Sequence, residues 1–225
     1  MVNRARIAFY WTIKTIAWPV THGYVRLRVL GSGNVPRKGP CIVVANHTSF
    51  VDAIVLGSAC PRRITFLITR PIYSMWRLRW FYYMMGSIPV APEVPDPGAL
   101  KAAFRTLHRG DVVGIFPEGQ RMADGNLGEG KAGVALIAAR SGVPVVPAAI
   151  IGAHRVMPVG AMLPRIHPVR VVFGEQIRFP AVEGRRPSRQ QVDVFADQVM
   201  KAIADLIAAG APETGRDRGL RTTST

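Results

Sequence analysis

Apolar and polar positions along the chain alternate between short, uninterrupted apolar runs and longer segments with helical spacing. The apolar runs are short and are bounded by polar, Gly or Pro residues, which is typical of buried strands. We predict strands over residues 41–45, 64–68, 87–90, 112–116, 143–151 and 169–173. Residues 24–30 differ, because Val25, Leu27 and Val29 alternate with arginines, and this alternation predicts a half-exposed strand.

Segments with helical spacing separate these strands. Residues 97–109 place four apolar side chains on one helical face: Leu100, Ala103, Phe104 and Leu107. Residues 131–140 form another predicted helix, which ends at Gly142. A last helix begins near Ser188, which forms a capping-box pattern with Gln191. Its apolar stripe is typical of core packing and comprises Val192, Phe195, Val199, Ile203 and Leu206. Strands that alternate with helices predict the α/β class: a single layered domain with a largely parallel sheet flanked by helices.

The N-terminal residues 5–20 are apolar and aromatic, but they contain Lys14 and end near Pro19. A helix that spans a bilayer needs about 20 consecutive apolar residues, and no such run occurs in the sequence. A small-residue cleavage site is also missing, which argues against a signal peptide. Aromatic side chains beside basic ones indicate a helix at a membrane interface, and a helix packed on the domain is the alternative.

These features predict three parts. Residues 1–22 form an N-terminal amphipathic, membrane-associating segment, and residues 23–210 form one domain. Residues 211–225 form a polar tail that has little to bury and is expected to be disordered.

The net charge of the chain and its distribution indicate which classes of partner the protein could bind. The chain has 29 Lys and Arg against 14 Asp and Glu, for a net charge of +15, while 48% hydrophobic residues exclude a disordered chain. Asp52 is the only acidic residue before residue 93, so most of the net positive charge lies in the first two fifths of the chain. Such a surface attracts polyanions, namely nucleic acid, an anionic membrane or phosphorylated substrates. The two cysteines, Cys41 and Cys60, lie in apolar stretches, which favours a reducing compartment.

The first candidate site is the segment from Asn46 to Asp52, directly after the predicted strand 41–45. Ligands of open α/β sheets gather at the carboxyl ends of strands, and His47 can exchange a proton near neutral pH. A turn into a helix would bring the Asp52 carboxylate to the imidazole and leave the other ring nitrogen as a general base. The alternative is a histidine that caps a helix.

The second candidate site follows the strand 112–116. Pro117 and Gly119 bracket Glu118 and predict a tight turn that holds a carboxylate at the sheet edge. Arg121 could bind a phosphate bidentately, and Lys131 could add a point charge. A surface Glu–Arg pair in a loop is the alternative.

Other patterns are weaker. Residues 125–132 fit the first positions of a phosphate-binding P-loop, but Ala132 stands where Ser or Thr would hold magnesium, so we do not expect a nucleotide triphosphatase. No Cys/His cluster has metal-ligand spacing. Residues 70–85 interleave arginines with aromatic side chains. Stacking platforms for single-stranded nucleic acid show this pattern, but a lipid-interface helix and ordinary core are both favoured over it.

Taken in order, these segments resemble the 1-acylglycerol-3-phosphate acyltransferase family of the glycerolipid acyltransferases. The family's N-H-x4-D block corresponds to residues 46–52, and its F-P-E-G-T-R block to residues 116–121, where Gln120 replaces Thr. The K-x-G block lies at residues 131–133 and the V-P-v-v-P block at residues 143–147. The family's G-x-I-x-V stretch appears at residues 86–90, but its usual following Arg is absent, and residues 91–93 read Ala-Pro-Glu.

The resemblance, which covers residues 25–180, implies an acyltransferase domain over residues 23–210. It implies transfer of a fatty acyl group from acyl-CoA or acyl-carrier protein to a lysophospholipid hydroxyl, with 1-acylglycerol-3-phosphate as the expected acceptor. His47 and Asp52 would be catalytic, and the substrate-binding residues would be Glu118, Gly119, Arg121 and Lys131. The thioester would be the only co-substrate, with no metal and no other cofactor.

The expected partners are thus an acyl thioester donor, a lysophospholipid acceptor and an anionic membrane surface, without nucleic acid. The expected location is the cytoplasmic face of a membrane, as a peripheral or monotopic protein. A different lipid hydroxyl acceptor remains an alternative, as does a non-enzymatic, basic nucleic-acid- or membrane-binding protein.

Overall fold

The computed structural model describes residues 4–91, 96–122, 125–158, 161, 163–180 and 187–210. The predicted tail 211–225 lies outside them. A single sheet of seven strands has the order β1-β7-β6-β2-β5-β3-β4. The strands are β1 Arg28–Leu30, β2 Cys41–Ala45, β3 Ile64–Thr69, β4 Ile88–Val90, β5 Val112–Ile115, β6 Val145–Ile151 and β7 Arg170–Phe173. Every pairing is parallel except that of β6 with β7, so the predicted fold class is confirmed.

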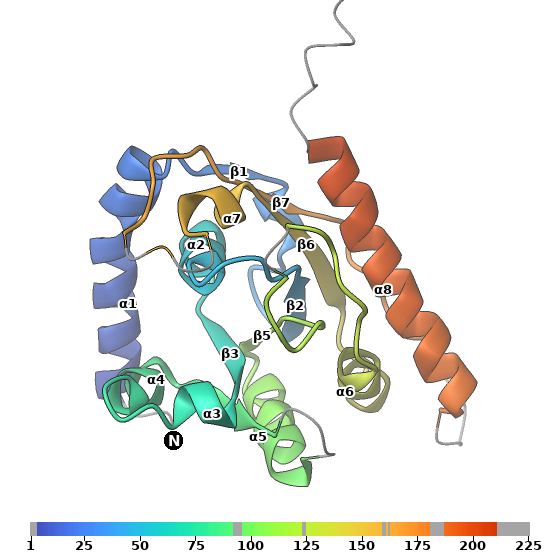
Figure 1. Cartoon of the computed structure of the whole chain (residues 1–225). Helices are drawn as coiled ribbons and strands as arrows, with labels where there is room; N and C mark the ends of the chain where they lie inside the picture. The colour runs from blue at the N-terminus through green and yellow to red at the C-terminus, as the bar shows by residue number, and fades with distance from the viewer. Residues whose placement is uncertain are drawn as a thin grey trace, which may run out of the picture.

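Helices cover both faces of this sheet (Figure 1). One face packs against α5 Pro97–His108, α6 Gly133–Ser141 and α8 Arg189–Gly210. The other packs against α2 Asp52–Ala59 and α7 Ala153–Val156. In β2, Ile42 and Val44 belong to the first core, and Cys41, Val43 and Ala45 to the second, because successive side chains of a strand point to opposite faces. A strand buried on both faces has to be apolar throughout, which explains the uninterrupted runs in the sequence.

The predicted strand over residues 24–30 is wrong in its first half. Residues Val20–Tyr24 form a π-helical turn, and the strand itself begins only at Arg28. Between them Arg26 adopts a positive φ of 51°. The side chains of Val25 and Leu27 are nevertheless buried. The alternating pattern therefore reported burial correctly, but the backbone that produces it is a turn.

The predicted start and buried stripe of the C-terminal helix are confirmed. The Ser188 Oγ accepts a hydrogen bond from the backbone N–H of Gln191 at 3.1 Å, and the Gln191 Oε1 accepts one from the N–H of Ser188 at 2.8 Å. This reciprocal pair is a capping box. The apolar stripe is buried at Val192, Phe195 and Val199, as expected for core packing.

Helix α1, Arg4–Pro19, has one packed side and one exposed side. On the packed side, the hydroxyl of Tyr10 accepts a hydrogen bond from the Ile64 N–H of β3 at 3.2 Å, and Lys14 donates one to the Cys60 carbonyl. Burial raises the pKa of Tyr10 to about 12 and lowers the pKa of Lys14. The exposed side carries Ile7, Trp11, Ile16 and Trp18. The helix is therefore packed on the domain along one side, while a membrane contact of its exposed side stays a prediction.

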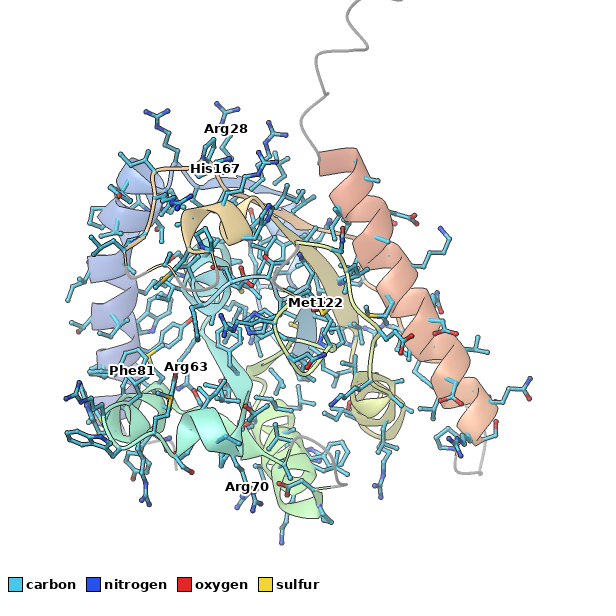
Figure 2. The ribbon with its side chains drawn as sticks, viewed as in Figure 1. Arg28, Arg63, Arg70, Phe81, Met122 and His167 are labelled. Atoms are coloured by element: carbon cyan, nitrogen blue, oxygen red, sulfur yellow. The ribbon has the colours of Figure 1, made fainter. Side chains whose placement is uncertain are left out.

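Residues 70–85 contain α3 Arg70–Tyr73, which follows directly after β3, and α4 Arg79–Met85, which packs against α1. Phe9 of α1 makes edge contacts with Trp80 and Phe81, and Figure 2 shows Phe81 on this side of the molecule. Much of the segment is exposed, above all Trp76 at 80%. With the exposed side of α1 it forms what we call the aromatic surface: Ile7, Trp11, Ile16, Trp18, Met75, Trp76, Trp80 and Tyr83. Among the described residues, no helix is long and apolar enough to cross a bilayer.

Candidate active site

His47 and Asp52 form a hydrogen-bonded pair at the carboxyl end of β2. The distance between the His47 Nδ1 and the Asp52 Oδ2 is 2.9 Å. Asp52 is fully buried at the start of α2, and its Oδ2 also accepts hydrogen bonds from the N–H groups of Thr48 at 2.6 Å and Ser49 at 2.7 Å. Because the carboxylate occupies Nδ1, the Nε2 of the ring is left to exchange a proton. The His47 side chain is 19% exposed, so a substrate can reach it.

The turn after β5 is attached to the backbone of His47 at two points. The Glu118 Oε1 accepts a hydrogen bond from the His47 N–H at 3.3 Å, and the Met122 N–H donates one to the His47 carbonyl at 2.8 Å. Glu118 is only 4% exposed. Its carboxylate thus orients the histidine backbone from inside the protein, and the loop around Met122 lies near the centre of Figure 2.

Gly119 brings Lys131 into the same region. Gly119 has a φ of +70°, and a Cβ there would lie 3.0 Å from both the Cε and the Nζ of Lys131. The Lys131 N–H also donates to the Pro117 carbonyl at 2.9 Å. Only a glycine lets the lysine side chain lie this close to the turn. The ammonium is therefore held against the turn that carries Glu118.

Arg121 connects the second sequence block to the first. Its guanidinium carbon lies 3.4 Å from the centre of the Phe50 ring. Phe50 is 56% exposed and stands two residues before Asp52. Its role has no signal in the sequence, because a single exposed apolar side chain is ordinary on a protein surface.

Asn46 is a second residue whose role was missed. Its side-chain amide donates to the Ile150 carbonyl at 2.9 Å and accepts from the Ile150 N–H at 2.7 Å. This pair of bonds joins the end of β2 to β6 where His47 leaves the sheet. A polar amide directly after a buried strand was the available signal.

The glycine-rich segment 125–131 packs on the site and does not form a P-loop. A Cβ at Gly128 would lie 2.9 Å from the Met122 sulfur and 3.3 Å from the Cγ of Glu118. A Cβ at Gly125 would lie 2.9 Å from the His154 Nδ1. Close packing is the reason for these two glycines, and the segment does not follow a strand directly, as a P-loop would.

All six predicted site residues thus come from the ends of two adjacent strands, β2 and β5, and their loops. The arrangement combines a proton acceptor supported by a buried carboxylate with two cationic side chains. It is suited to activating a hydroxyl group of an anionic substrate.

Within the described ranges, no group of three or more His, Cys, Asp or Glu side chains is placed to hold a metal ion. Pro92 and Glu93, which replace the expected block-two arginine, lie outside the described residues.

Comparison with known proteins places this site in a family context. The family model described as Acyltransferase matches residues 26–151. A curated relative, 1-acyl-sn-glycerol-3-phosphate acyltransferase BAT2, chloroplastic, of Brassica napus, is 35% identical over 141 residues, which are 61% of this chain and 41% of that protein. The 1-acyl-sn-glycerol-3-phosphate acyltransferase of Bacillus subtilis (strain 168) is 26% identical over 182 residues, which are 80% of this chain and 87% of that protein.

The chain therefore spans about two fifths of the length of the plant relatives it matches. Among solved structures, the 1-acyl-sn-glycerophosphate (LPA) acyltransferase PlsC from Thermotoga maritima superposes with a TM-score of 0.74. That superposition covers 95% of this chain and 86% of that one, at 23% sequence identity. At this identity the likeness supports the fold.

Proposed function

Because the chain belongs to the acyltransferase family, we propose that it transfers a fatty acyl group from a thioester donor to the free hydroxyl of 1-acyl-sn-glycerol 3-phosphate. The observation that carries the proposal is the hydrogen-bonded pair His47–Asp52, to which the loop of Arg121 is attached. The printed activity of the curated relatives supports the choice of acceptor. The product would be phosphatidic acid, as in phospholipid biosynthesis.

In the proposed reaction, the His47 Nε2 removes the proton of the acceptor hydroxyl as its oxygen attacks the thioester carbonyl carbon. The tetrahedral intermediate then expels the thiolate, which takes the proton from the imidazolium. Asp52 holds the ring and stabilises its positive charge through Nδ1. A positioned general base contributes a factor of about 10²–10⁴ to the rate. An acyl-enzyme is unnecessary, because a thioester is already activated.

The acceptor phosphate is the natural ligand for Arg121 and Lys131. A guanidinium binds a phosphate with two parallel hydrogen bonds, and an ammonium adds a compact charge. Glu118 and Gly119 act less directly. Glu118 holds the His47 backbone, and Gly119 leaves room for Lys131.

An apolar pocket of about 80 Å³ between α1, α2 and α4 is the proposed site of an acyl chain. Tyr10, Gly57, Phe66 and Phe81 are among its lining residues. The Phe66 ring stacks on Phe116, with 5.8 Å between ring centres, and Phe116 stacks on His47. A chain in this pocket would therefore approach the imidazole along a continuous aromatic path.

The aromatic surface is the proposed contact with an anionic membrane. Its exposed tryptophans favour the headgroup region of a bilayer, and Arg77 and Arg79 lie within the same segment. Each Lys or Arg near an anionic surface contributes about 1 kcal/mol, and salt weakens this attraction. We propose a peripheral or monotopic position on the cytoplasmic face, where anionic lipids are concentrated.

The direct test is acyl transfer by the purified chain. Acyl-CoA and acyl-carrier protein are offered separately as donors with a panel of lipid acceptors, while thiol release is followed and the products are identified by mass spectrometry. Phosphatidic acid formed from 1-acyl-sn-glycerol 3-phosphate supports the proposal. Preferred acylation of another lipid hydroxyl would identify that lipid as the acceptor instead. No transfer to any acceptor would contradict the proposed function.

A further inference from the structure

The contact between Arg121 and Phe50 differs from the other cation–ring contacts of the described chain. The guanidinium carbon of Arg121 is 3.4 Å from the ring centre, whereas the four other such contacts lie between 4.5 and 5.9 Å. A separation of 3.4 Å from the centre requires the cation to lie over the ring face, where the quadrupole of the ring attracts it.

The Phe50 ring lies directly against the Arg121 guanidinium. Neither a hydrogen bond nor an ion pair joins the Arg121 guanidinium to any residue in the described part of the chain. All five N–H donors of a guanidinium lie in its plane. Because the ring covers the face, the donors at the edge stay available for an anion.

The same turn carries Phe50 and the catalytic pair. Just before Phe50, the N–H groups of Thr48 and Ser49 donate to Asp52, and the Ser49 hydroxyl donates to the Met157 carbonyl at 3.2 Å. These bonds fix the backbone from which the ring projects. The position of the guanidinium is therefore tied to the position of the His47 imidazole, through a ring that belongs to the first sequence block.

We propose that Phe50 is a positioning residue that holds the Arg121 guanidinium flat, so that its edge meets the phosphate of the acceptor at a set distance from His47. This inference rests on the proposed function of the site. It goes beyond that function because it makes the exposed ring at position 50 a determinant of acceptor affinity.

Kinetics of Phe50 variants test the proposal, with 1-acyl-sn-glycerol 3-phosphate and the donor varied separately. Phe50→Leu keeps an apolar side chain but removes the π face, so the KM for the acceptor should rise about three- to tenfold. The kcat and the donor KM should stay within about twofold, and Phe50→Trp should restore the acceptor KM. Because the ring acts through Arg121, adding Phe50→Leu to Arg121→Gln should raise the acceptor KM no further.

Phe104→Leu is the matched control. Phe104 belongs to α5, outside the site, and its ring centre lies 5.9 Å from the guanidinium carbon of Arg140 on α6. This variant should leave the acceptor KM unchanged. An unchanged acceptor KM in Phe50→Leu would overturn the proposal. So would failure of Phe50→Trp to restore it, or an equal additional loss in the Arg121→Gln background, which would indicate that Phe50 touches the lipid itself.

A spectroscopic measurement separates this proposal from the proposed function. In protein labelled with ¹⁵N-arginine, the Nε–H resonance of Arg121, identified by its loss in Arg121→Lys, should be shifted upfield by the ring current of Phe50. Phe50→Leu should remove that shift. Wild-type protein that shows the shift but transfers no acyl group would contradict the function and leave the contact standing, while absence of the shift would overturn the contact.

Discussion

The imidazole of His47 lies nearly parallel to the ring of Phe116, with 4.3 Å between ring centres and 17° between the planes. The two residues come from different sequence blocks, at the ends of β2 and β5. The stacking holds the imidazole plane, while Asp52 holds its Nδ1. Two independent contacts therefore set the direction of Nε2, which a general base requires.

The proposed base is tested by His47→Ala and Asp52→Asn. His47→Ala should lower kcat by about 10²–10⁴-fold, since the group that accepts the proton is gone. The double variant should lose little more than His47→Ala alone, because the two side chains act as one unit. Thiol release reports the rate, and circular dichroism checks that His47→Ala is folded. Wild-type turnover in a folded His47→Ala protein would rule out the mechanism.

Asp52→Asn should also lower stability. The carboxylate accepts hydrogen bonds from two buried N–H groups and from His47 through one oxygen. An amide accepts less strongly and can turn its NH₂ toward these donors, and an unpaired buried polar group costs about 1–3 kcal/mol. Urea denaturation should show this loss of unfolding free energy. Unchanged stability would mean that these short hydrogen bonds are not formed in solution.

Arg121→Lys tests the phosphate-binding role. The variant keeps the charge but loses the planar fork, so the KM for the acceptor should rise by more than that for the donor. The control is Arg109→Lys, because Arg109 pairs with Asp111 at the end of α5, away from the site. A selective loss of donor affinity in Arg121→Lys would reassign this residue to the thioester.

Gly57→Leu tests the acyl-chain pocket. Gly57 lies on α2 and lines the pocket, and a Cβ there would lie 3.6 Å from the Tyr10 hydroxyl, an ordinary contact distance. A leucine side chain should therefore occupy pocket volume, and its helix propensity exceeds that of glycine. We expect kcat/KM for long-chain donors to fall about tenfold relative to short-chain donors. An equal decrease for all chain lengths would place the acyl chain elsewhere.

Membrane contact is best tested on the exposed side of α1 and on residues 70–85, since deleting α1 would also remove the buried Tyr10. Trp18→Gln with Trp76→Gln should weaken binding to anionic vesicles, because both tryptophans are more than half exposed. Wild-type binding should decrease only in part at high salt, since apolar burial is not screened. The control is Val194→Gln, an exposed apolar position on α8, across the molecule from α1 (Figure 1). Equal vesicle sedimentation of both variants would contradict the aromatic surface as the contact.

Tyr10 gives a pH test of how α1 is attached. Burial raises its pKa to about 12 in the folded protein, from the usual tyrosine value of about 10, so the folded state keeps a proton that the unfolded state loses between these values. Stability should therefore fall as the pH rises above 10, by up to about 1.4 kcal/mol per pH unit. Tyr10→Phe lacks this loss, so its difference in unfolding free energy from wild type should shift in its favour between pH 10 and 11. A pH-independent difference would show that the phenol is solvated.

Much of the architecture follows from local sequence patterns. Six strands lie where apolar runs predicted them, with ends that differ by at most two residues. The strands of a parallel sheet that is covered on both faces are buried on both sides, so they have to be apolar throughout. Uninterrupted apolar runs therefore mark their positions in the sequence. The prediction of a strand over residues 24–30 was wrong in its first half for a physical reason. Alternating burial also arises in an irregular turn, here one that follows the π-helical residues Val20–Tyr24 and has a positive φ at Arg26.

The sequence by itself determined the chemistry available at the site, because His47, Asp52, Glu118, Arg121 and Lys131 follow two predicted strands. The tertiary structure decided how that chemistry is arranged. Strand order makes β2 and β5 neighbours, which lets Glu118 and Met122 bind the His47 backbone and lets Arg121 stack on Phe50. Residues about 70 positions apart meet only after the sheet has formed, so no local pattern could reveal that the exposed ring of Phe50 lies beneath a guanidinium.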